Sequence, residues 1–476
     1  MKRGETYTGE VRLFTFPDKG IACVEESEVL IRGTLPGQEV SFILSKNKAG
    51  LREGRLLEIK RRSETETIKG CSVCGRDDIR YRCGGCIFQT IPYEEELKLK
   101  DSTVREILGK ALKQHGYDGE RFDSLYEGIT GSPEISGYRN KMEFSFGNAV
   151  KDGPLTLGMH VAGHFMDVLD TPDCNIVDED FRKIREYCKV YALKKGLGFY
   201  HRGSNSGYLR NLLIRKGINT GEILVDLVTT SGGEADEEEF TKGLLELSLD
   251  GSLVGILHTL NDAPADAVVN EKTTVLYGRD HVYDELLGLR FKISAFSFFQ
   301  TNTRGAEVLY TRVRDYVSFA GREASGVVYD LYSGTGTIAQ IVSDTASSVY
   351  GIEIVSEAVE AAVKNAEANG IGNTHFICGD VLQALDEIEA KPDLIILDPP
   401  RGGVNPKALK KILDYGVEYI IYISCKITSL ARDLHLMSEE GYEPVRLSAV
   451  DMFPRTSGIE GIALFRRNGG GKSYEM

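Results

Sequence analysis

The stretch VVYDLYSGTGTIAQ, residues 327–340, decides the fold that we predict for the carboxy-terminal part of the chain. An apolar run ends in a loop with two glycines, and the loop leads into residues with a helical pattern. Gly334 and Gly336 let the backbone pass close to a ligand, and the start of the following helix directs free N–H groups at that ligand. The stretch therefore predicts a strand, a ligand-binding loop and a helix.

The same alternation continues on the carboxy-terminal side of this unit. Apolar runs predict strands at residues 327–332, 349–354, 374–379, 393–398 and 419–424, and amphipathic patterns predict helices near 337–346, 356–369, 406–415 and 429–440. The helix at 356–369 is expected to start at Ser356 and to end at Asn369-Gly370. Such alternation favours an α/β fold, a Rossmann-like domain over 291–476 with helices on both faces of a parallel sheet.

Acidic residues lie at the end of two predicted strands and directly after a third. Glu353, Asp380 and Asp398 stand where ligands bind in open α/β sheets, just beyond the carboxyl ends of the strands. Glu353 is placed to accept both ribose hydroxyls of an adenosine, and Asp380 is placed near the adenine. The glycine loop lacks the GxGxxG spacing and a second mononucleotide-binding half is missing, so S-adenosylmethionine (SAM) fits this pattern better than NAD.

Cys425 lies at the end of a predicted strand in ISCKITSLARD, residues 423–433. A helix start next to it would favour the thiolate, which is the nucleophilic form of cysteine. The alternative interpretation is a buried, inert cysteine, and we prefer that alternative for Cys23, Cys188 and Cys378. The position of Cys425 at the ligand edge of the sheet favours a chemical role.

A thiolate suits the methylation of uracil at C5. C5 is a poor nucleophile until a thiolate adds to C6, and a general base must then remove the C5 proton. Glu460, in DMFPRTSGIEGIALF (451–465), is the candidate base, although from sequence alone the preferred interpretation of this residue is a surface loop acid. Asp398 and Arg401, in DPPR (398–401), could bind the uracil edge or hold the loop.

The amino-terminal part differs in pattern. Residues 1–62 predict a small β-barrel that resembles a TRAM domain, an OB-like RNA-binding module, in GIACV (20–24), GTLPG (33–37) and a basic last strand. Residues 63–290 form a central α+β region that is hard to place, with a helix over 89–125 that could pack on the catalytic domain. Residues 46–62 hold seven Lys/Arg against two Asp/Glu, a pattern that suits either RNA contact or a solvated face.

Composition limits the possible partners. The net charge of −14 argues against a general nucleic-acid coat, so an RNA partner must meet a local basic surface. No apolar run approaches the length of a membrane span, and the first residues lack the apolar segment of a signal peptide. We expect a cytoplasmic protein without a membrane partner, of two to four domains and monomeric by default.

Nine cysteines are present, and four of them crowd into residues 71–86. In a chain without a signal peptide this crowding indicates metal or cluster binding rather than disulfides. By spacing alone, the pairs Cys71/Cys74 and Cys83/Cys86 suit a tetrahedral zinc at least as well as a cluster.

Taken together, the motifs resemble the RNA uracil-5-methyltransferase family, and most closely its TRAM-bearing, iron–sulfur members that act on 23S rRNA. The resemblance covers nearly the whole chain. The motifs that carry it, besides the barrel, are CGGC (83–86), GYRNKMEFSF (137–146), FSFFQTN (296–302), DLYSGTGT (330–337), LDPPRGG (397–403), SC with LARD (424–433) and DMFPRT…E (451–460).

The resemblance implies a role for each matching position. Cys425 corresponds to the nucleophile and Glu460 to the general base. The residues implied to bind SAM are Gln300, Tyr332, Gly334, Gly336, Thr337, Glu353, Asp380 and Asp398. The resemblance further implies a [4Fe-4S] cluster on Cys83, Cys86, Cys174 and Cys74, with Cys71 as the alternative to Cys74 and zinc as the alternative metal. The implied substrate is 23S rRNA, and related enzymes act on tRNA.

Five positions depart from the family pattern. Lys426-Ile427 replaces a usual Asn-Pro after the nucleophile, Gly458 stands where His is common, Ser333 where Cys is frequent, and Thr337 where Asn is frequent.

Two rival functions stay open. An N-methyltransferase would need no thiolate, so the requirement for Cys425 discriminates, and a non-catalytic RNA-binding protein would keep its cellular role without Cys425.

Overall fold

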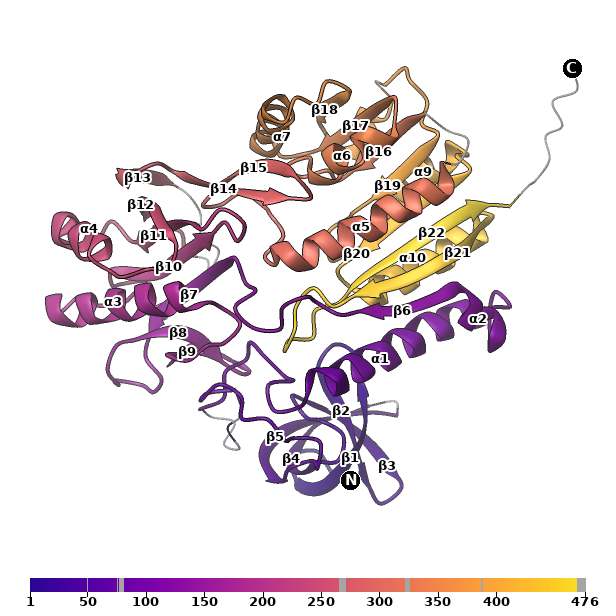
Figure 1. Ribbon diagram of the computed structural model, residues 1–476. Coiled ribbons are helices and arrows are strands. Elements are labelled where there is room, and N and C mark those ends of the chain that lie inside the picture. Colours follow the sequence, from indigo (N-terminus) through magenta and orange to yellow (C-terminus); the bar gives the residue numbers. More distant parts are fainter. Residues whose placement is uncertain are drawn as a thin grey trace, which may run out of the picture.

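The computed structural model describes residues 1–48, 50–74, 76, 81–264, 271–321, 326–386 and 388–468. The described chain forms an amino-terminal barrel, a central domain built on a seven-stranded sheet, and a carboxy-terminal domain built on an eight-stranded sheet (Figure 1). No helix within these residues is long and apolar enough to cross a membrane.

The carboxy-terminal sheet has the strand order β18-β17-β16-β19-β20-β22-β21-β6. Its first five strands are mutually parallel: β16 (Val327–Leu331), β17 (Ser348–Glu353), β18 (Thr374–Cys378), β19 (Leu394–Leu397) and β20 (Tyr419–Ser424). The strand β22 (Glu460–Arg467) then runs antiparallel between β20 and β21 (Tyr442–Val450). The predicted α/β fold with a Rossmann-like domain is confirmed.

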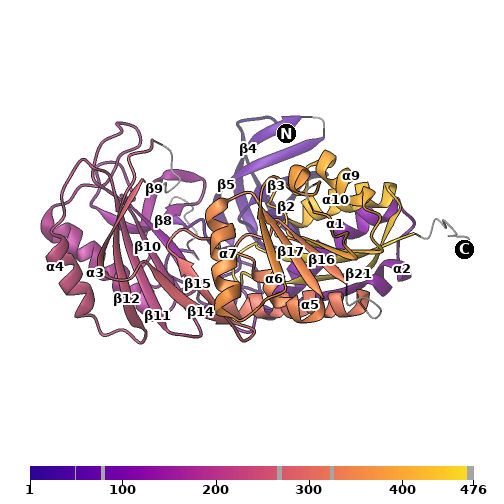
Figure 2. The same ribbon diagram turned by 90° about the horizontal axis from the view of Figure 1, so that it is seen from above.

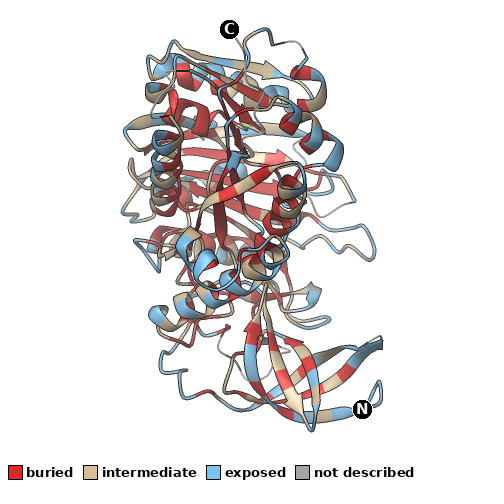
Figure 3. Ribbon diagram, turned by 90° about the vertical axis from the view of Figure 1, so that its right-hand side faces the viewer, coloured by how far each residue is buried: buried red, intermediate tan, exposed pale blue. Residues whose placement is uncertain are grey.

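Helices cover both faces of this sheet (Figure 2). One face packs on α5 (Thr303–Ala320), α6 (Thr337–Ile341) and the hairpin of β14 (His281–Leu286) and β15 (Leu289–Ser294). The other face packs on α1 (Tyr93–Lys113), α9 (Pro406–Asp414) and α10 (Ile427–Glu439). In β19, Leu394 and Ile396 enter the first core, and Ile395 and Leu397 enter the second, which explains the unbroken apolar run of this strand. Buried residues accordingly line the sheet on both sides (Figure 3).

The helix expected over 89–125 is in fact two helices. The helix α1 starts after Pro92 and ends at Lys113, and α2 covers Glu120–Leu125. Between them, Gly116 and Gly119 have φ of 79° and 50°, a backbone conformation that ends a right-handed helix. The strand β6 (Tyr126–Thr130) follows at once and pairs in parallel with β21. Residues 93–130 therefore extend the catalytic sheet and its core.

The helix α7 (Ser356–Ala368) starts at Ser356, as expected, but Ser356 is not its capping residue. Its capping position is held by Val355, whose side chain offers no hydrogen-bond acceptor, and Ser356 is already helical. The end of the helix follows the expected pattern, because Asn369 is the last capping residue and Gly370 takes φ 68°. A short helix α8 (Val381–Ala384) and a 3₁₀ turn (Ser343–Thr345) complete this domain.

The amino-terminal strands close into a barrel in the order β1-β2-β3-β5-β4. They are β1 (Thr6–Thr15), β2 (Lys19–Val24), β3 (Ser27–Arg32), β4 (Glu39–Lys48) and β5 (Leu51–Arg61). The barrel has its own apolar core, which includes Val11, Ile31 and Phe42. A second small core joins Phe14 and Leu35 of the barrel to Phe88 and Ile91, just ahead of α1.

The central domain is a seven-stranded sheet in the order β13-β12-β11-β10-β7-β8-β9. The strands are β7 (Lys141–Gly147), β8 (Thr156–Val161), β9 (His164–Asp170), β10 (Leu209–Lys216), β11 (Glu222–Thr229), β12 (Ser252–Leu260) and β13 (Lys272–Gly278), accompanied by α3 (Glu179–Lys195) and α4 (Glu237–Leu245). Cys71, Cys74, Cys83, Cys86 and Cys174 share the core of this sheet.

Candidate active site

The predicted cofactor and chemical residues gather at one edge of the catalytic sheet. Glu353, Asp398 and Cys425 stand at or just beyond the carboxyl ends of β17, β19 and β20. Asp330, which the sequence analysis did not single out, stands near the end of β16. The strand order reverses direction between β16 and β19, which is the switch point where open α/β sheets bind ligands.

The loop between β16 and α6 has a backbone shaped for close approach of a ligand. Tyr332 takes φ 68°, a left-handed conformation that is rare for a side chain of its size and that marks functional loops. Gly336 takes φ 70°, and a Cβ atom there would lie 2.5 Å from the ring of Phe376. A tight, preformed loop at the start of a helix is suited to hold a small ligand.

Glu353 holds this loop from the neighbouring strand. Its Oε2 accepts a hydrogen bond from the N–H of Gly334 at 3.0 Å, and its Oε1 accepts one from the N–H of Val355 at 3.0 Å. The carboxylate therefore lies beside the glycine loop, as the cofactor interpretation requires. Thr337 is the first residue of α6, with its Oγ1 3.4 Å from that of Thr335. Asp380 is exposed and caps α8 through the N–H of Leu382 at 2.9 Å.

Gln300 is placed by contacts from the central domain. Asn140, in the GYRNK motif, donates through Nδ2 to the carbonyl of Gln300 at 2.8 Å and to the hydroxyl of Thr303 at 2.9 Å. Arg215 is buried and its Nε donates to the carbonyl of Ala295 at 2.9 Å. Two motifs that lie far apart in sequence thus form one unit at the site.

Cys425 and Glu460 face each other across two neighbouring strands. Ser424 at the end of β20 pairs with Gly461 of β22 in antiparallel register, so the next residues along, Cys425 and Glu460, are opposite each other. Glu460 is 4% exposed, and Cys425 is half-buried. The acid that sequence alone could not distinguish from a surface residue is therefore buried beside the thiol.

The expectation that the helix start would favour a thiolate at Cys425 is not met in the free protein. Burial raises the pKa of Cys425 to about 11, with a further rise from the charges of Glu460 and Asp398 and a partial offset from Arg401. Lys426 is the capping residue of α10, so Cys425 lies two positions before the first helical residue, Ile427. Desolvation and two nearby carboxylates outweigh the helix dipole at this distance.

Three carboxyl groups of the site also hold their protons more tightly than usual. Burial raises the pKa of Asp398 to about 7 and that of Asp330 to about 8, and in Asp330 the charge of Asp398 adds to the rise. Burial, and then the charge of Asp398, raise the pKa of Glu460 well above its usual range. The ionised forms of buried acids repel one another, and a cationic ligand nearby stabilises those ionised forms. SAM carries such a charge on its sulfur.

Two further residues of the site were missed by the sequence analysis. Tyr310 of α5 is 3% exposed, forms a hydrogen bond with Gln300 and is close enough to Asp398 and Glu460 to feel their charges. Asp433 of α10 is fully buried and accepts from the N–H of Val404 at 2.9 Å and from the hydroxyl of Tyr422. Asp433 thereby holds the loop after Asp398. The helical spacing of apolar residues in 303–320 would have revealed α5, whereas no local pattern marks Tyr310 as a site residue.

The structure gives a local account of two departures from the family pattern. A Cβ atom at Gly458 would lie 2.5 Å from the ring of Phe453, so the space of a side chain there is occupied. At Lys426 the exposed side chain is directed away from the core, and its N–H donates to Ser424 Oγ at 3.3 Å. The Oγ of Ser333 is buried without a partner among the described residues.

The five cysteines of the cysteine site (Cys71, Cys74, Cys83, Cys86 and Cys174) are all buried. Hydrogen bonding to Cys74 lowers the pKa of Cys71 to about 7, and Cys74 forms further thiol contacts with Cys83 and Cys86 that raise its own pKa. Burial raises the pKa of Cys174 to about 12, and the charges of Cys86 and Cys71 add to it. Among the described residues, no three side chains meet the geometry of ligands around one metal ion. The donor chemistry, buried thiols within reach of one another, fits a thiolate-bound centre.

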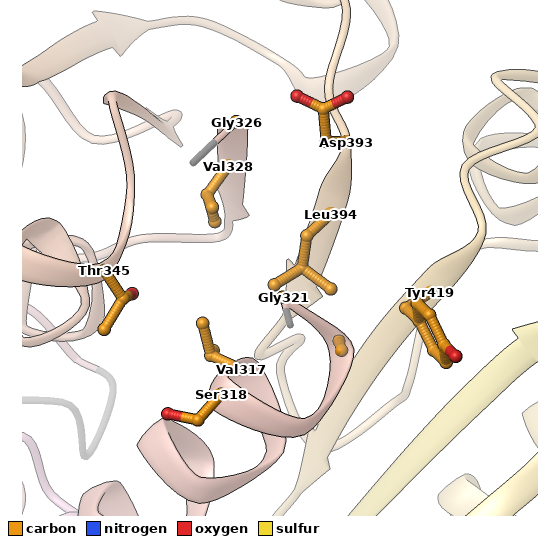
Figure 4. A pocket seen from close by; sticks show the side chains of 10 residues that line it. Val317, Ser318, Gly321, Gly326, Val328, Thr345, Asp393, Leu394 and Tyr419 are labelled. Atoms are coloured by element: carbon orange, nitrogen blue, oxygen red, sulfur yellow. The ribbon is translucent and has the colours of Figure 1, made fainter. Parts of the chain in front are cut away.

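A cavity of about 260 Å³ lies at the opposite end of the same strands (Figure 4). Its walls include Val328, Asp393, Leu394 and Tyr419, which stand near the starts of β16, β19 and β20. Ligands of open α/β sheets bind at the carboxyl ends instead, so this cavity is remote from the chemistry.

Comparison with known proteins agrees with this geometry. Residues 270–468 match the model of the tRNA (uracil-5-)-methyltransferase family. An uncharacterized RNA methyltransferase of Caldanaerobacter subterraneus subsp. tengcongensis is 43% identical over 98% of this chain and 100% of its own, and one of Clostridium acetobutylicum is 44% identical over 98% and 99%. The crystal structure of the tRNA (uracil-54, C5)-methyltransferase of Pyrococcus abyssi, in complex with S-adenosyl-L-homocysteine, covers 96% of this chain with a TM-score of 0.73 at 23% identity, a likeness of fold.

The fold and the site define a SAM-dependent RNA methyltransferase. The chain belongs to the RNA uracil-5-methyltransferase family.

Proposed function

We propose that the protein methylates C5 of a uridine in RNA, with Cys425 as nucleophile and Glu460 as general base. The observation that carries this proposal is the pairing of the thiol and the buried acid across the ends of β20 and β22, with Asp398 close to both. An N-methyltransferase has no use for a thiol opposite a carboxylate at the ligand edge of the sheet.

In the proposed reaction, the sulfur of Cys425 adds to C6 of the uracil and makes C5 electron-rich. SAM, when bound, supplies a methyl group on a cationic sulfur, and its charge also favours the ionised forms of Cys425, Asp398 and Glu460. C5 forms a bond to this methyl group as the bond from the methyl carbon to the sulfur breaks, and the neutral thioether S-adenosylhomocysteine is the leaving group. Glu460 then takes the proton from C5, the C5=C6 double bond re-forms, and the bond from C6 to the sulfur breaks. Gln300, Tyr332, Gly334, Gly336, Thr337, Glu353, Asp380 and Asp398 are the residues that we assign to SAM binding.

The first test is tritium release from RNA that carries 5-tritiated uridine, measured with and without SAM. We expect SAM-dependent release with the wild-type protein and no release with Cys425→Ala, which should still bind SAM. The control is Cys378→Ala, because Cys378 is exposed at the end of β18 and lies outside the proposed chemistry. Methylation of RNA without tritium release would show that another atom accepts the methyl group.

Replacement of Glu460 tests the base directly. We expect Glu460→Gln to accumulate a covalent, methylated protein–RNA adduct, because the thiolate cannot leave until the C5 proton has left. The adduct would appear as a slow band in a denaturing gel and would be absent from Cys425→Ala/Glu460→Gln. Release of methylated RNA by Glu460→Gln at the wild-type rate would remove Glu460 from the mechanism.

We further propose 23S rRNA as the substrate, with the β1–β5 barrel as a TRAM-type RNA-binding domain. The exposed basic side chains of β5 support RNA contact, and tRNA is the second candidate because the matching family model is named for tRNA. Cells without this protein should lose 5-methyluridine from 23S rRNA and keep it in tRNA, as measured by mass spectrometry of the two nucleoside digests. The opposite result would assign the enzyme to tRNA.

For the cysteine site we propose a [4Fe-4S] cluster bound by Cys83, Cys86, Cys174 and either Cys74 or Cys71. The all-thiol donor set supports it, and such a centre would supply a rigid crosslink rather than a step of methyl transfer. Protein purified without oxygen should contain iron and sulfide and absorb visible light. Stoichiometric zinc without iron would instead favour the tetrahedral alternative.

A further inference from the structure

A network of buried charges joins α1 to the loop that ends at Glu460. Lys100 is 1% exposed, and its Nζ donates to Oε1 of Glu96 at 2.8 Å and to Oδ1 of Asp451 at 2.7 Å. Glu96 and Asp451 are fully buried, and Arg455 is also buried. We refer to Glu96, Lys100, Asp451 and Arg455 as the strap network. Its two cations and two anions balance in formal charge.

The strap network holds the backbone of the hairpin loop 451–459, which connects β21 to β22. The N–H of Arg455 donates to Oε1 of Glu96 at 2.7 Å, and Nζ of Lys100 also donates to the carbonyl of Phe453 at 3.3 Å. Arg455 takes φ 71°, a left-handed conformation that costs about 1 kcal/mol for a residue with a side chain and persists only where surrounding contacts impose it.

Further side chains and backbone N–H groups form hydrogen bonds to the same loop. The hydroxyl of Tyr93 donates to Oδ2 of Asp451 at 2.9 Å, that of Tyr138 donates to the carbonyl of Pro454 at 2.8 Å, and Nδ2 of Asn302 donates to that of Met452 at 2.8 Å. The N–H groups of Ile87 and Phe88, directly after Cys86, both donate to the carbonyl of Arg455, at 2.8 and 3.1 Å. The loop is thus tied to α1, to α5, to the central domain and to the cysteine segment.

The carboxylate of Glu460 depends on the position of this loop. Glu460 is the first residue of β22 and pairs with Val450, the last residue of β21. The loop 451–459 therefore connects two residues that are paired in the sheet. Burying four charged side chains costs free energy of desolvation, and only well-placed ion pairs and hydrogen bonds offset that cost. The loss of one partner leaves an uncompensated buried charge. The network is therefore suited to fix one conformation of the loop rather than merely to add stability.

We propose that the strap network positions Glu460 for removal of the C5 proton, and that Lys100 is the residue that organises it. This inference rests on the proposed C5 chemistry. Lys100, Glu96 and Arg455 act through the loop and not on the substrate, so they are positioning residues. Proton removal should be more sensitive to the network than methyl transfer, because Cys425 directly follows β20 and lies outside the loop.

The test separates the two steps in single-turnover experiments with RNA carrying 5-tritiated uridine and SAM with a labelled methyl group. For Lys100→Met we expect methyl transfer within about threefold of the wild-type rate, tritium release slower by about tenfold or more, and an accumulating covalent adduct. Lys98→Met is the matched control, because Lys98 forms an exposed ion pair with Glu95 on the same helix and should leave both rates unchanged.

Lys100→Met leaves Asp451 without its cation and Glu96 with Arg455 alone, and the variant could fail to fold. Tyr93→Phe is the milder second variant: it removes the hydrogen bond that Tyr93 donates to Asp451 and the one that it accepts from the N–H of Ser132. It keeps every charge, and a smaller selective loss of tritium release is expected. Equal slowing of both steps in the variants that fold, or no slowing of either, would overturn the positioning role. Absence of tritium release from the wild-type protein would overturn the proposed function instead, so the two failures are distinguishable.

Discussion

At the scale of single residues, the thiol of Cys425 has to lose a proton that its surroundings retain. Burial and the charges of Glu460 and Asp398 raise its pKa, and Arg401 is the group that lowers it. Arg401 also lowers the pKa of Glu460. The reaction needs both groups without their protons, so turnover below saturating SAM should increase with pH across the neutral range.

Arg401→Gln should move the rising part of the pH–rate profile to higher pH, by roughly half a unit, because the favourable charge beside both acids is lost. The measurement is kcat/KM for RNA between pH 6 and 9.5. Arg401→Lys keeps the charge and should keep the profile. A profile of Arg401→Gln that shifts to lower pH would contradict the direction of this coupling.

At the scale of elements, the loop between β16 and α6 combines a conformational and a steric requirement for glycine. In Gly336→Ala the alanine backbone would have to take φ 70°. Its methyl group would also have to displace the ring of Phe376, which lies 2.5 Å from the position of the new Cβ atom. We expect a loss of about 2 kcal/mol or more in the free energy of unfolding and weaker SAM binding, measured by chemical denaturation and calorimetry.

Gly370→Ala provides the matched control for this substitution. Gly370 has nearly the same φ, 68°, but no described atom lies within 4 Å of the position that a Cβ would take. It should lose only about 1 kcal/mol from the backbone conformation and bind SAM normally. Equal effects of the two substitutions on SAM affinity would show that the Gly336 loop does not contact the cofactor.

The elements also show what sequence patterns can and cannot predict. The inner parallel strands β16, β17, β19 and β20 carry strong apolar runs because both of their faces pack on apolar cores, so their positions followed from sequence alone. The strand β6 did not, because five residues at a sheet edge carry little pattern and their partner, β21, lies more than 300 residues away. Burial of Glu460 depends on the β20–β22 register, and the contact of Tyr310 with Gln300 depends on the packing of α5; both are tertiary properties.

At the scale of the whole molecule, an acidic chain has to bind a polyanion. The net charge is −14, yet the exposed face of β5 carries Arg55, Lys60 and Arg61. The barrel has a core of its own and meets the remainder of the chain through Phe14, Leu35, Phe88 and Ile91. The barrel can therefore present basic side chains to RNA. The buried acids of the active site lie in the carboxy-terminal domain, where a cationic cofactor would bind.

This division of charge predicts that RNA affinity and SAM affinity can be changed separately. Arg55→Gln with Lys60→Gln should weaken RNA binding and reduce the slope of log K against log salt concentration by about 1.4, because each lost phosphate contact accounts for about 0.7. Filter binding over a series of KCl concentrations measures both quantities. Lys364→Gln on α7 is the control, since Lys364 is exposed beside Glu360 and lies outside the barrel. An unchanged slope in the barrel variant, with SAM affinity also unchanged, would mean that the basic side chains of β5 form only a solvated face. RNA would then be bound by the central and catalytic domains.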